Sequence, residues 1–215
     1  MIPRLHVVTD DRVLARSDFR RRAREVLEAG GPNLALHLRG PETAGRVVFE
    51  YCADLEGPAR SAGALLMVND RVDVALACGL PGAHLPGRGM PTRDARALLG
   101  REVVLGRSVH DVDEARRAEA EGVDLLLLGT IFSTASHPER PGAGVDLVGR
   151  VRTRTRVPLV AIGGIDETRV GPVREAGGDG VAVLRAVWDR SRVGRAVVGL
   201  LEALDEGTLP RSSGP

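Results

Sequence analysis

The stretch PLVAIGGIDETRVGPVREAGGDGVAVLR, residues 158–185, decides the fold. It contains two short apolar runs, Pro158–Ile162 and Gly180–Leu184, separated by a segment whose helix is expected to end near Gly177. Both runs are rich in Val, Leu and Ile and lie beside Gly, Pro or Asp, as is typical of strands buried on both faces. The stretch therefore predicts one strand–helix–strand unit of a parallel sheet.

The same unit recurs along the rest of the chain. The other strand-like runs are Leu5–Thr9, Leu34–Arg39, Ala64–Val68, Gly82–Leu85, Glu102–Arg107 and Asp124–Leu128. With helical segments between them, at roughly 25 residues per repeat, they predict an α/β fold of the (β/α)8 TIM-barrel class. The alternative, an open doubly wound sheet, has a glycine-rich turn after its first strand, but this chain has Val8-Thr9-Asp10-Asp11 there.

Two local patterns refine this prediction. Asp111 is followed three residues later by Glu114, which is the pattern of a capping box and predicts a helix start. The basic run at residues 20–22 is interpreted as the solvated face of the first helix rather than as a polyanion-binding patch, because acidic residues elsewhere balance it.

The composition excludes several kinds of chemistry. The chain has 30 basic and 29 acidic side chains, and all the basic ones are arginine because the sequence contains no lysine. Lysine Schiff bases, lysine general bases and lysine ammonium groups on phosphates are therefore excluded. A formal net charge of +1 and an aromatic content of 2% do not suit nucleic-acid binding, which needs a basic face or stacking platforms. We expect no nucleic-acid partner.

Residues 1–205 are expected to form a single barrel domain, with residues 206–215 as a flexible C-terminal tail. The first residues have neither the pattern of a signal peptide nor that of a membrane anchor. No later segment reaches the roughly 18 apolar residues that a membrane span needs. We expect a cytoplasmic protein without a membrane partner, in which Cys52 and Cys78 are reduced thiols.

Glycines and polar residues at the predicted strand ends indicate a phosphate site, because the active site of a barrel forms where its strands end. Gly163 and Gly164 leave backbone N–H groups open, and a helix beginning near Arg185 would point its positive end inward. Arg39 is a candidate clamp for a carboxylate or phosphate group. Further candidates for substrate contact at strand ends are Asn69 and Ser108.

Histidines are the candidate groups for proton transfer. His37 and His84 lie on predicted strands, and either could instead be a hydrogen-bonded core residue. His137 lies in the long loop after the sixth strand, where an exposed histidine without a role is the alternative. Hydroxyl groups of this loop that could contact phosphate are those of Thr130, Thr134 and Ser136.

Eight segments carry a family resemblance. In chain order they are LHVVTD (5–10), LHLR (36–39), VNDRVDVA (68–75), GAHL (82–85), GRSVH (106–110), GTIFST (129–134), AIGGI (161–165) and GVAVLRA (180–186). Together they resemble the thiamine phosphate synthase and TenI superfamily over nearly the whole chain. The resemblance implies a (β/α)8 barrel and one of two activities. The synthase joins a pyrimidine diphosphate to a thiazole phosphate with Mg²⁺, and the TenI-type tautomerase aromatises a thiazole carboxylate phosphate by moving protons.

The chain departs from the synthase pattern at several positions. The Arg-Glu-Lys motif after the second strand is Arg39-Gly40-Pro41 here, so the lysine expected to hold the diphosphate is missing. The first magnesium aspartate is retained as Asp70, whereas residues 86–89 contain no second aspartate. The lysine of the phosphate loop is replaced by His137. Lost positive charge disfavours the departure of a diphosphate.

These departures favour the TenI-type branch, and the first hypothesis is a thiazole tautomerase that needs no cofactor. Its catalytic histidine would be His137, His84 or His37, because the usual position after the sixth strand holds Thr130. The alternative is a thiamine phosphate synthase with Mg²⁺ on Asp70, and the second alternative is a phosphate-binding homologue without catalysis. The expected partner is a small-molecule phosphate ester, and the resemblance implies that two barrels can pair as a homodimer.

Overall fold

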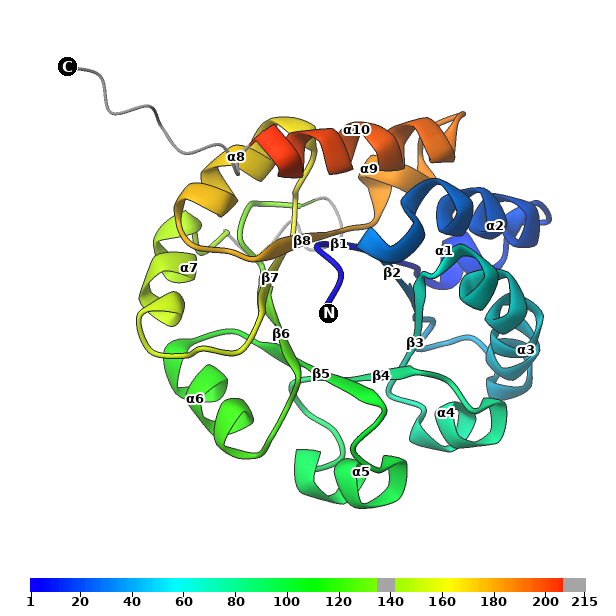
Figure 1. Ribbon diagram of the computed structural model, residues 1–215, viewed down its shortest axis with the longest axis horizontal. Helices are drawn as coiled ribbons and strands as arrows, with labels where there is room; N and C mark the ends of the chain where they lie inside the picture. The colour runs from blue at the N-terminus through cyan, green and yellow to red at the C-terminus, as the bar shows by residue number, and fades with distance from the viewer. Residues whose placement is uncertain (135–141, 207–215) are drawn as a thin grey trace.

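Eight parallel strands close into a barrel in the order β1 to β8, each hydrogen-bonded to the next and β8 to β1 (Figure 1). The computed structural model describes residues 1–134 and 142–206. The strands are β1 (Leu5–Val8), β2 (Leu34–Leu38), β3 (Leu65–Asn69), β4 (Gly82–Leu85), β5 (Val104–Val109), β6 (Leu125–Gly129), β7 (Leu159–Ile162) and β8 (Gly180–Val183). The predicted (β/α)8 barrel is confirmed, with β3, β5 and β6 shifted toward the C-terminus of their predicted runs.

Helices surround the barrel in chain order (Figure 1). They are α1 (Asp11–Leu14), α2 (Phe19–Gly30), the 3₁₀ turn η1 (Gly31–Asn33), α3 (Gly45–Ala62), α4 (Val72–Cys78), α5 (Thr92–Leu99), α6 (Val112–Ala120), α7 (Val145–Arg152), α8 (Glu167–Glu175), α9 (Arg185–Trp188) and α10 (Val193–Glu206). The capping pattern at Asp111 is confirmed, because its side chain accepts a hydrogen bond from the Glu114 N–H. Glu206, expected to begin the tail, is the last residue of α10, and residues 207–215 lie outside the described residues.

The barrel interior is small and mostly apolar. Its buried apolar residues are Val8, Ala35, Met67, Leu125, Leu127, Val160 and Ala182. They alternate along the strands with residues that face the helices, as the period of two requires. Ile2 packs against this inner cluster, and the N-terminus lies at the centre of the ring in the view down the barrel (Figure 1). The N-terminal segment therefore closes the end of the barrel opposite the carboxyl ends of the strands.

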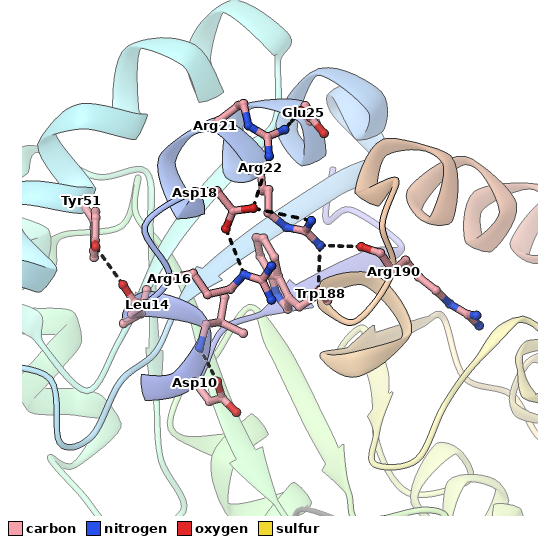
Figure 2. Close-up of polar contacts among 11 residues, drawn as sticks. Asp10, Leu14, Arg16, Asp18, Arg21, Arg22, Glu25, Tyr51, Trp188 and Arg190 are labelled. Carbon is pink, nitrogen blue, oxygen red and sulfur yellow. Dashed lines mark hydrogen bonds and ion pairs between the residues drawn. The ribbon is translucent and has the colours of Figure 1, made fainter.

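Arg22 fixes the short helix α9 against α2 (Figure 2). Its side chain is 6% exposed, and Nη2 donates to the carbonyl oxygens of Trp188 at 2.8 Å and Arg190 at 2.6 Å. These carbonyls are at the C-terminal end of α9, where a helix needs donors. Arg22 is thus not part of the solvated face expected for residues 20–22, because packing against α9 buries it. Arg20 and Arg21 form surface ion pairs with Asp54 and with Asp18 and Glu25.

No helix within residues 1–134 and 142–206 combines the length and the apolar character needed to cross a membrane.

Candidate active site

Two adjoining cavities open at the carboxyl ends of the strands. The first, of about 460 Å³, lies over β6, β7 and β8, and the second, of about 350 Å³, lies over β2, β3 and β4. Residues that line both cavities are Arg39, Ser108 and His110. The mouth therefore has two compartments with a common wall, which is enough room for two small ligands side by side.

Gly163 and Gly164 form the floor of the first cavity after β7. Both have positive φ, 108° and 62°, which favours glycine. A Cβ atom would lie 2.5 Å from Cγ2 of Thr130 at position 163 and 2.6 Å from the carbonyl oxygen of Ser133 at position 164. The two glycines thus let the loop after β6 pack directly on the turn after β7. Among the described residues, neither glycine N–H donates to another backbone group, so both remain available to a ligand.

Arg185 closes the same cavity from the end of β8. Its Nη2 donates a hydrogen bond of 2.7 Å to Oγ1 of Thr134, and both residues line the first cavity. Thr130 also lines this cavity. A guanidinium, open backbone N–H groups and hydroxyl groups in one cavity match the chemistry that binds a phosphate monoester.

The second cavity contains Arg39, Asn69, Asp70 and Arg71. Arg39 is exposed, and its guanidinium has no hydrogen-bond or ion-pair partner in the described part of the chain. Asp70 is the single non-glycine residue with positive φ within the described ranges, at 62°, and its N–H donates to the carbonyl oxygen of His84 at 2.9 Å. Strained backbone of this kind persists where the surroundings hold it, and it places the Asp70 carboxylate at the mouth.

The loop after β4 forms the far wall of the second cavity. Arg107 holds this loop, since its guanidinium donates to the carbonyl oxygens of Met90 at 3.0 Å and Gly87 at 3.2 Å. A Cβ on Gly89 would lie 3.4 Å from Oδ1 of Asp70, so this glycine lies where a second carboxylate could approach the first.

His84 lies beneath the common wall. It is 1% exposed, and its Nε2 is 2.8 Å from Oγ of Ser108, while the buried Nδ1 has no partner in the described structure. A buried orphan acceptor is less costly than a buried orphan N–H, so the proton belongs on Nε2 and is donated to Ser108. The Ser108 hydroxyl is then free to donate its own proton to a ligand in either cavity.

A chain of hydrogen bonds inside the barrel connects the N-terminal segment to Asn69. Nε2 of His6 is 2.9 Å from the carbonyl oxygen of Pro3, and Nδ1 of His6 is 2.8 Å from Nε2 of His37. Nδ1 of His37 is 3.2 Å from Oδ1 of Asn69. A carbonyl only accepts, so His6 carries its proton on Nε2 and accepts from His37. Nδ1 of His37 is then an acceptor, which requires the amide nitrogen of Asn69 to face it. This assignment exchanges the amide oxygen and nitrogen of Asn69, so that the oxygen turns away from His37.

Burial keeps these histidines neutral. It lowers the pKa of His6 to about 3 and that of His37 to about 4, and it also lowers the pKa of His84 below its ordinary value. Desolvation is the main cause for all three, because the charged form loses its hydration inside the barrel. At neutral pH these rings are hydrogen-bonding groups without charge.

The structure gathers most of the predicted site residues at one mouth. The first cavity contains Arg39, Ser108, Thr130, Thr134, Gly163, Gly164 and Arg185, and the second contains Arg39, Asn69, Asp70, His84 and Ser108. His37 lies below the mouth and lines neither cavity. Ser136 and His137 lie outside the described residues.

Arg71 and His6, which sequence reasoning did not select, also belong to this region, as does His110 at the end of the GRSVH segment. His110 lines both cavities, and Arg71 lines the second. His6 orients His37 from inside the barrel. The signals available were weak: Arg71 directly follows Asp70, and His6 lies two residues before Val8 on the inward face of β1.

Comparison with known proteins agrees with the fold and with the superfamily resemblance. The family model for thiamine monophosphate synthase (TMP-TENI) matches residues 5–187. A thiamine-phosphate synthase of Natronomonas pharaonis is 39% identical over 192 residues, covering 86% of this chain and 89% of that protein. Another, of Gloeobacter violaceus, is 38% identical over 80% of this chain, which spans about half, 50%, of that relative's length. The solved structure of thiamine phosphate pyrophosphorylase from Pyrococcus furiosus has a TM-score of 0.83 and 31% identity, covering 96% of this chain and 97% of that one.

These findings correct the expected activity. The hypothesis of a TenI-like thiazole tautomerase is wrong, because relatives that match over most of the chain are named as synthases and the similar solved structure as a pyrophosphorylase. The hypothesis treated the missing lysine at Pro41 as lost charge, but Arg39 and Arg71 line the same cavity as Pro41. The superfamily resemblance is confirmed and its TenI-type branch is not: the chain belongs to the thiamine monophosphate synthase family.

Proposed function

We propose that the protein is a transferase that joins a pyrimidine diphosphate to a thiazole phosphate and releases diphosphate. The observation that carries the proposal is the division of the mouth into two cavities that share Arg39 and Ser108. A reaction between two phosphorylated ligands needs two anion sites with a common wall where the reacting atoms meet. The names of relatives with 35–39% identity over most of the chain support the same activity.

The first cavity suits the thiazole phosphate. The N–H groups of Gly163 and Gly164 and the guanidinium of Arg185 would hold its phosphate, with Thr134 oriented by Arg185. Holding the phosphate at the far wall leaves the heterocycle directed toward Ser108 and Arg39. The chain's contribution here is positioning, which brings the ring nitrogen to the common wall.

The second cavity suits the pyrimidine diphosphate. In the reaction, the thiazole nitrogen forms a C–N bond to the pyrimidine methylene carbon, and the C–O bond to the diphosphate breaks. The attacking nitrogen has no proton to lose, and the diphosphate leaves as an anion. This chemistry asks for positive charge near the leaving group rather than for a general base, and the neutral, buried His37 and His84 agree with that need.

Mg²⁺ is the cofactor that this activity implies, and the residues present fit it in part. Within the described residues no group of three or more His, Cys, Asp or Glu side chains could hold a metal ion. Asp70 nevertheless presents one carboxylate to the second cavity, and Mg²⁺ is usually bound by one or two carboxylates together with substrate phosphates. Asp70 would hold the ion, which would neutralise charge on the diphosphate. Arg39 supplies further positive charge from the common wall.

The test is a coupling assay with the purified full-length protein, both substrates and Mg²⁺. We expect thiamine phosphate and diphosphate to form in equal amounts, and the rate to fall by about 10²–10³-fold in Arg39→Gln. Arg116→Gln, which changes an exposed arginine on α6, is the matched control and should retain the wild-type rate. Absence of product at every Mg²⁺ concentration would exclude the proposed activity.

A further inference from the structure

We propose that Arg71 binds the diphosphate in the second cavity and replaces the lysine that is absent at position 41. The inference rests on the proposed function for the identity of the ligand. The position of Arg71 itself follows from the structure.

Arg71 and Pro41 belong to the same wall region. Both line the second cavity, together with Gly40 and Thr43 of the loop between β2 and α3. Pro41 offers no charge and no N–H donor. Arg71 comes from the neighbouring loop between β3 and α4, directly after Asp70. Arg71 therefore brings a basic residue to the cavity that Pro41 also lines.

Gly45, the first residue of α3, makes room for this guanidinium. A Cβ atom at position 45 would lie closest to Nη1 of Arg71 and 2.8 Å from both Cζ and Nη2, so the arginine side chain would have to move. Gly45 is not among the glycines with positive φ, so its backbone does not require glycine. Glycine also lowers helix stability relative to alanine. Glycine at the start of α3 thus leaves room for the Arg71 side chain in its observed position.

Asp73 orients the guanidinium. Nε and Nη2 of Arg71 donate to the two carboxylate oxygens of Asp73 at 2.8 Å and 2.6 Å. This pair uses one edge of the planar fork, and Nη1, which lies nearest to Gly45, makes no hydrogen bond or ion pair within the described residues. The first turn of α3 has no acidic residue that would compete for Nη1. An anion in the second cavity, which Arg71 lines, would take the hydrogen bonds of this remaining edge.

Two arginines now face the diphosphate position from different loops. Arg39 directly follows β2, and Arg71 is the N-cap residue of α4. Guanidinium groups bind phosphate oxygens with paired hydrogen bonds, so Arg71 can replace the charge of a lysine while adding directional contacts. The retained Asp70 lies between these two arginines in the sequence and lines the same cavity.

The test measures binding of inorganic pyrophosphate with Mg²⁺ by titration calorimetry on the full chain. We expect Arg71→Gln to weaken binding at least tenfold, and Arg71→Gln combined with Pro41→Lys to recover most of that loss. Arg46→Gln is the matched control, since Arg46 on α3 is 88% exposed and pairs with Glu50. It should bind like the wild type. Thermal unfolding of each variant shows that the fold is retained.

A second pair of variants tests the position of the guanidinium. Gly45→Ala should weaken pyrophosphate binding by displacing Arg71, whereas Gly57→Ala in the same helix should not, because a Cβ there has nothing within 4 Å. Wild-type affinity in Arg71→Gln, or no recovery with Pro41→Lys, would overturn the proposal. If Arg71→Gln loses pyrophosphate binding and the wild type does not couple the two substrates, the role of Arg71 is supported and the transferase activity is refuted. If the wild type couples them and Arg71→Gln has an unchanged KM for the diphosphate, the transferase activity is supported and the role of Arg71 is refuted.

Discussion

Arg185 donates a hydrogen bond of 2.7 Å from Nη2 to Oγ1 of Thr134, which links the end of β8 to the loop after β6. Both residues line the first cavity, together with Gly163 and Gly164. Arg22 fixes α9 at its other end through the carbonyl oxygens of Trp188 and Arg190 (Figure 2). The guanidinium of Arg185 is thus held by a helix that is itself anchored to α2.

Replacing Arg185 should weaken the monophosphate site. A hydrogen bond that involves a charged group contributes about 1.5–3 kcal/mol, so Arg185→Gln should raise the KM for thiazole phosphate by roughly 10–100-fold. The KM for the diphosphate should change little, because Arg185 does not line the second cavity. Steady-state kinetics with each substrate varied in turn measure this difference. An equal rise in both KM values would show that Arg185 acts on the whole mouth.

Substituting Gly164 should damage the same site through the backbone. Gly164→Ala places a Cβ 2.6 Å from the Ser133 carbonyl oxygen at a φ of 62°, so the loop after β6 must move. We expect a lower unfolding midpoint and weaker binding of thiazole phosphate. Gly171→Ala in α8 is the matched control, since its Cβ would meet nothing within 4 Å and alanine favours helix. Unchanged ligand affinity in Gly164→Ala would contradict a close-packed phosphate turn.

Stability should fall as the pH drops below 6.5. The pKa values of His6 and His37 are lowered by burial to about 3 and about 4, so only the unfolded chain binds protons between about pH 6.5 and pH 4. Each such histidine costs up to about 1.4 kcal/mol per pH unit in this range. Urea unfolding at pH 7.5, 6.0 and 5.0 measures how the free energy of unfolding changes with pH. His37→Gln should reduce this slope by the contribution of one proton. A flat free energy of unfolding from pH 7.5 to 5.0 would contradict neutral, buried rings.

The Pro3 carbonyl, which can only accept a hydrogen bond, should determine the tautomers of His6 and His37. We expect protons on Nε2 of both His6 and His37, and an unprotonated Nδ1 on each ring. Long-range ¹H–¹⁵N correlation spectra of histidine side chains distinguish these states directly. A proton on Nδ1 of His37 would mean that the Asn69 carbonyl faces His37 rather than turning away from it.

The sequence predicted the fold well because the barrel depends on local patterns. Short apolar runs such as Pro158–Ile162 identify buried strands, and Asp111 with Glu114 identifies a helix start. It also placed Gly163, Gly164 and Arg185 together, since strand ends of a parallel barrel share one edge. Strand boundaries at β3, β5 and β6 were less accurate, because hydrogen-bonded register extends beyond the apolar run.

The rest depends on contacts between segments that are distant in sequence. Burial of Arg22 requires α9, whose residue Trp188 lies 166 residues later in the sequence. The place of Arg71 depends on the start of α3, and the role of His6 depends on the registration of β1 with β2. The activity was predicted wrongly for the same reason: motif positions showed which charges were missing but not which arginines line the same cavity.

The most direct test of the central claim follows both substrates at once by ³¹P NMR in Mg²⁺ buffer. If the two cavities hold the two substrates against a common wall, the signals of the pyrimidine diphosphate should decline only when thiazole phosphate is present. Free diphosphate and thiamine phosphate should then appear in a ratio of one to one. Release of diphosphate without thiazole phosphate, or no change in any signal with both substrates present, would contradict it.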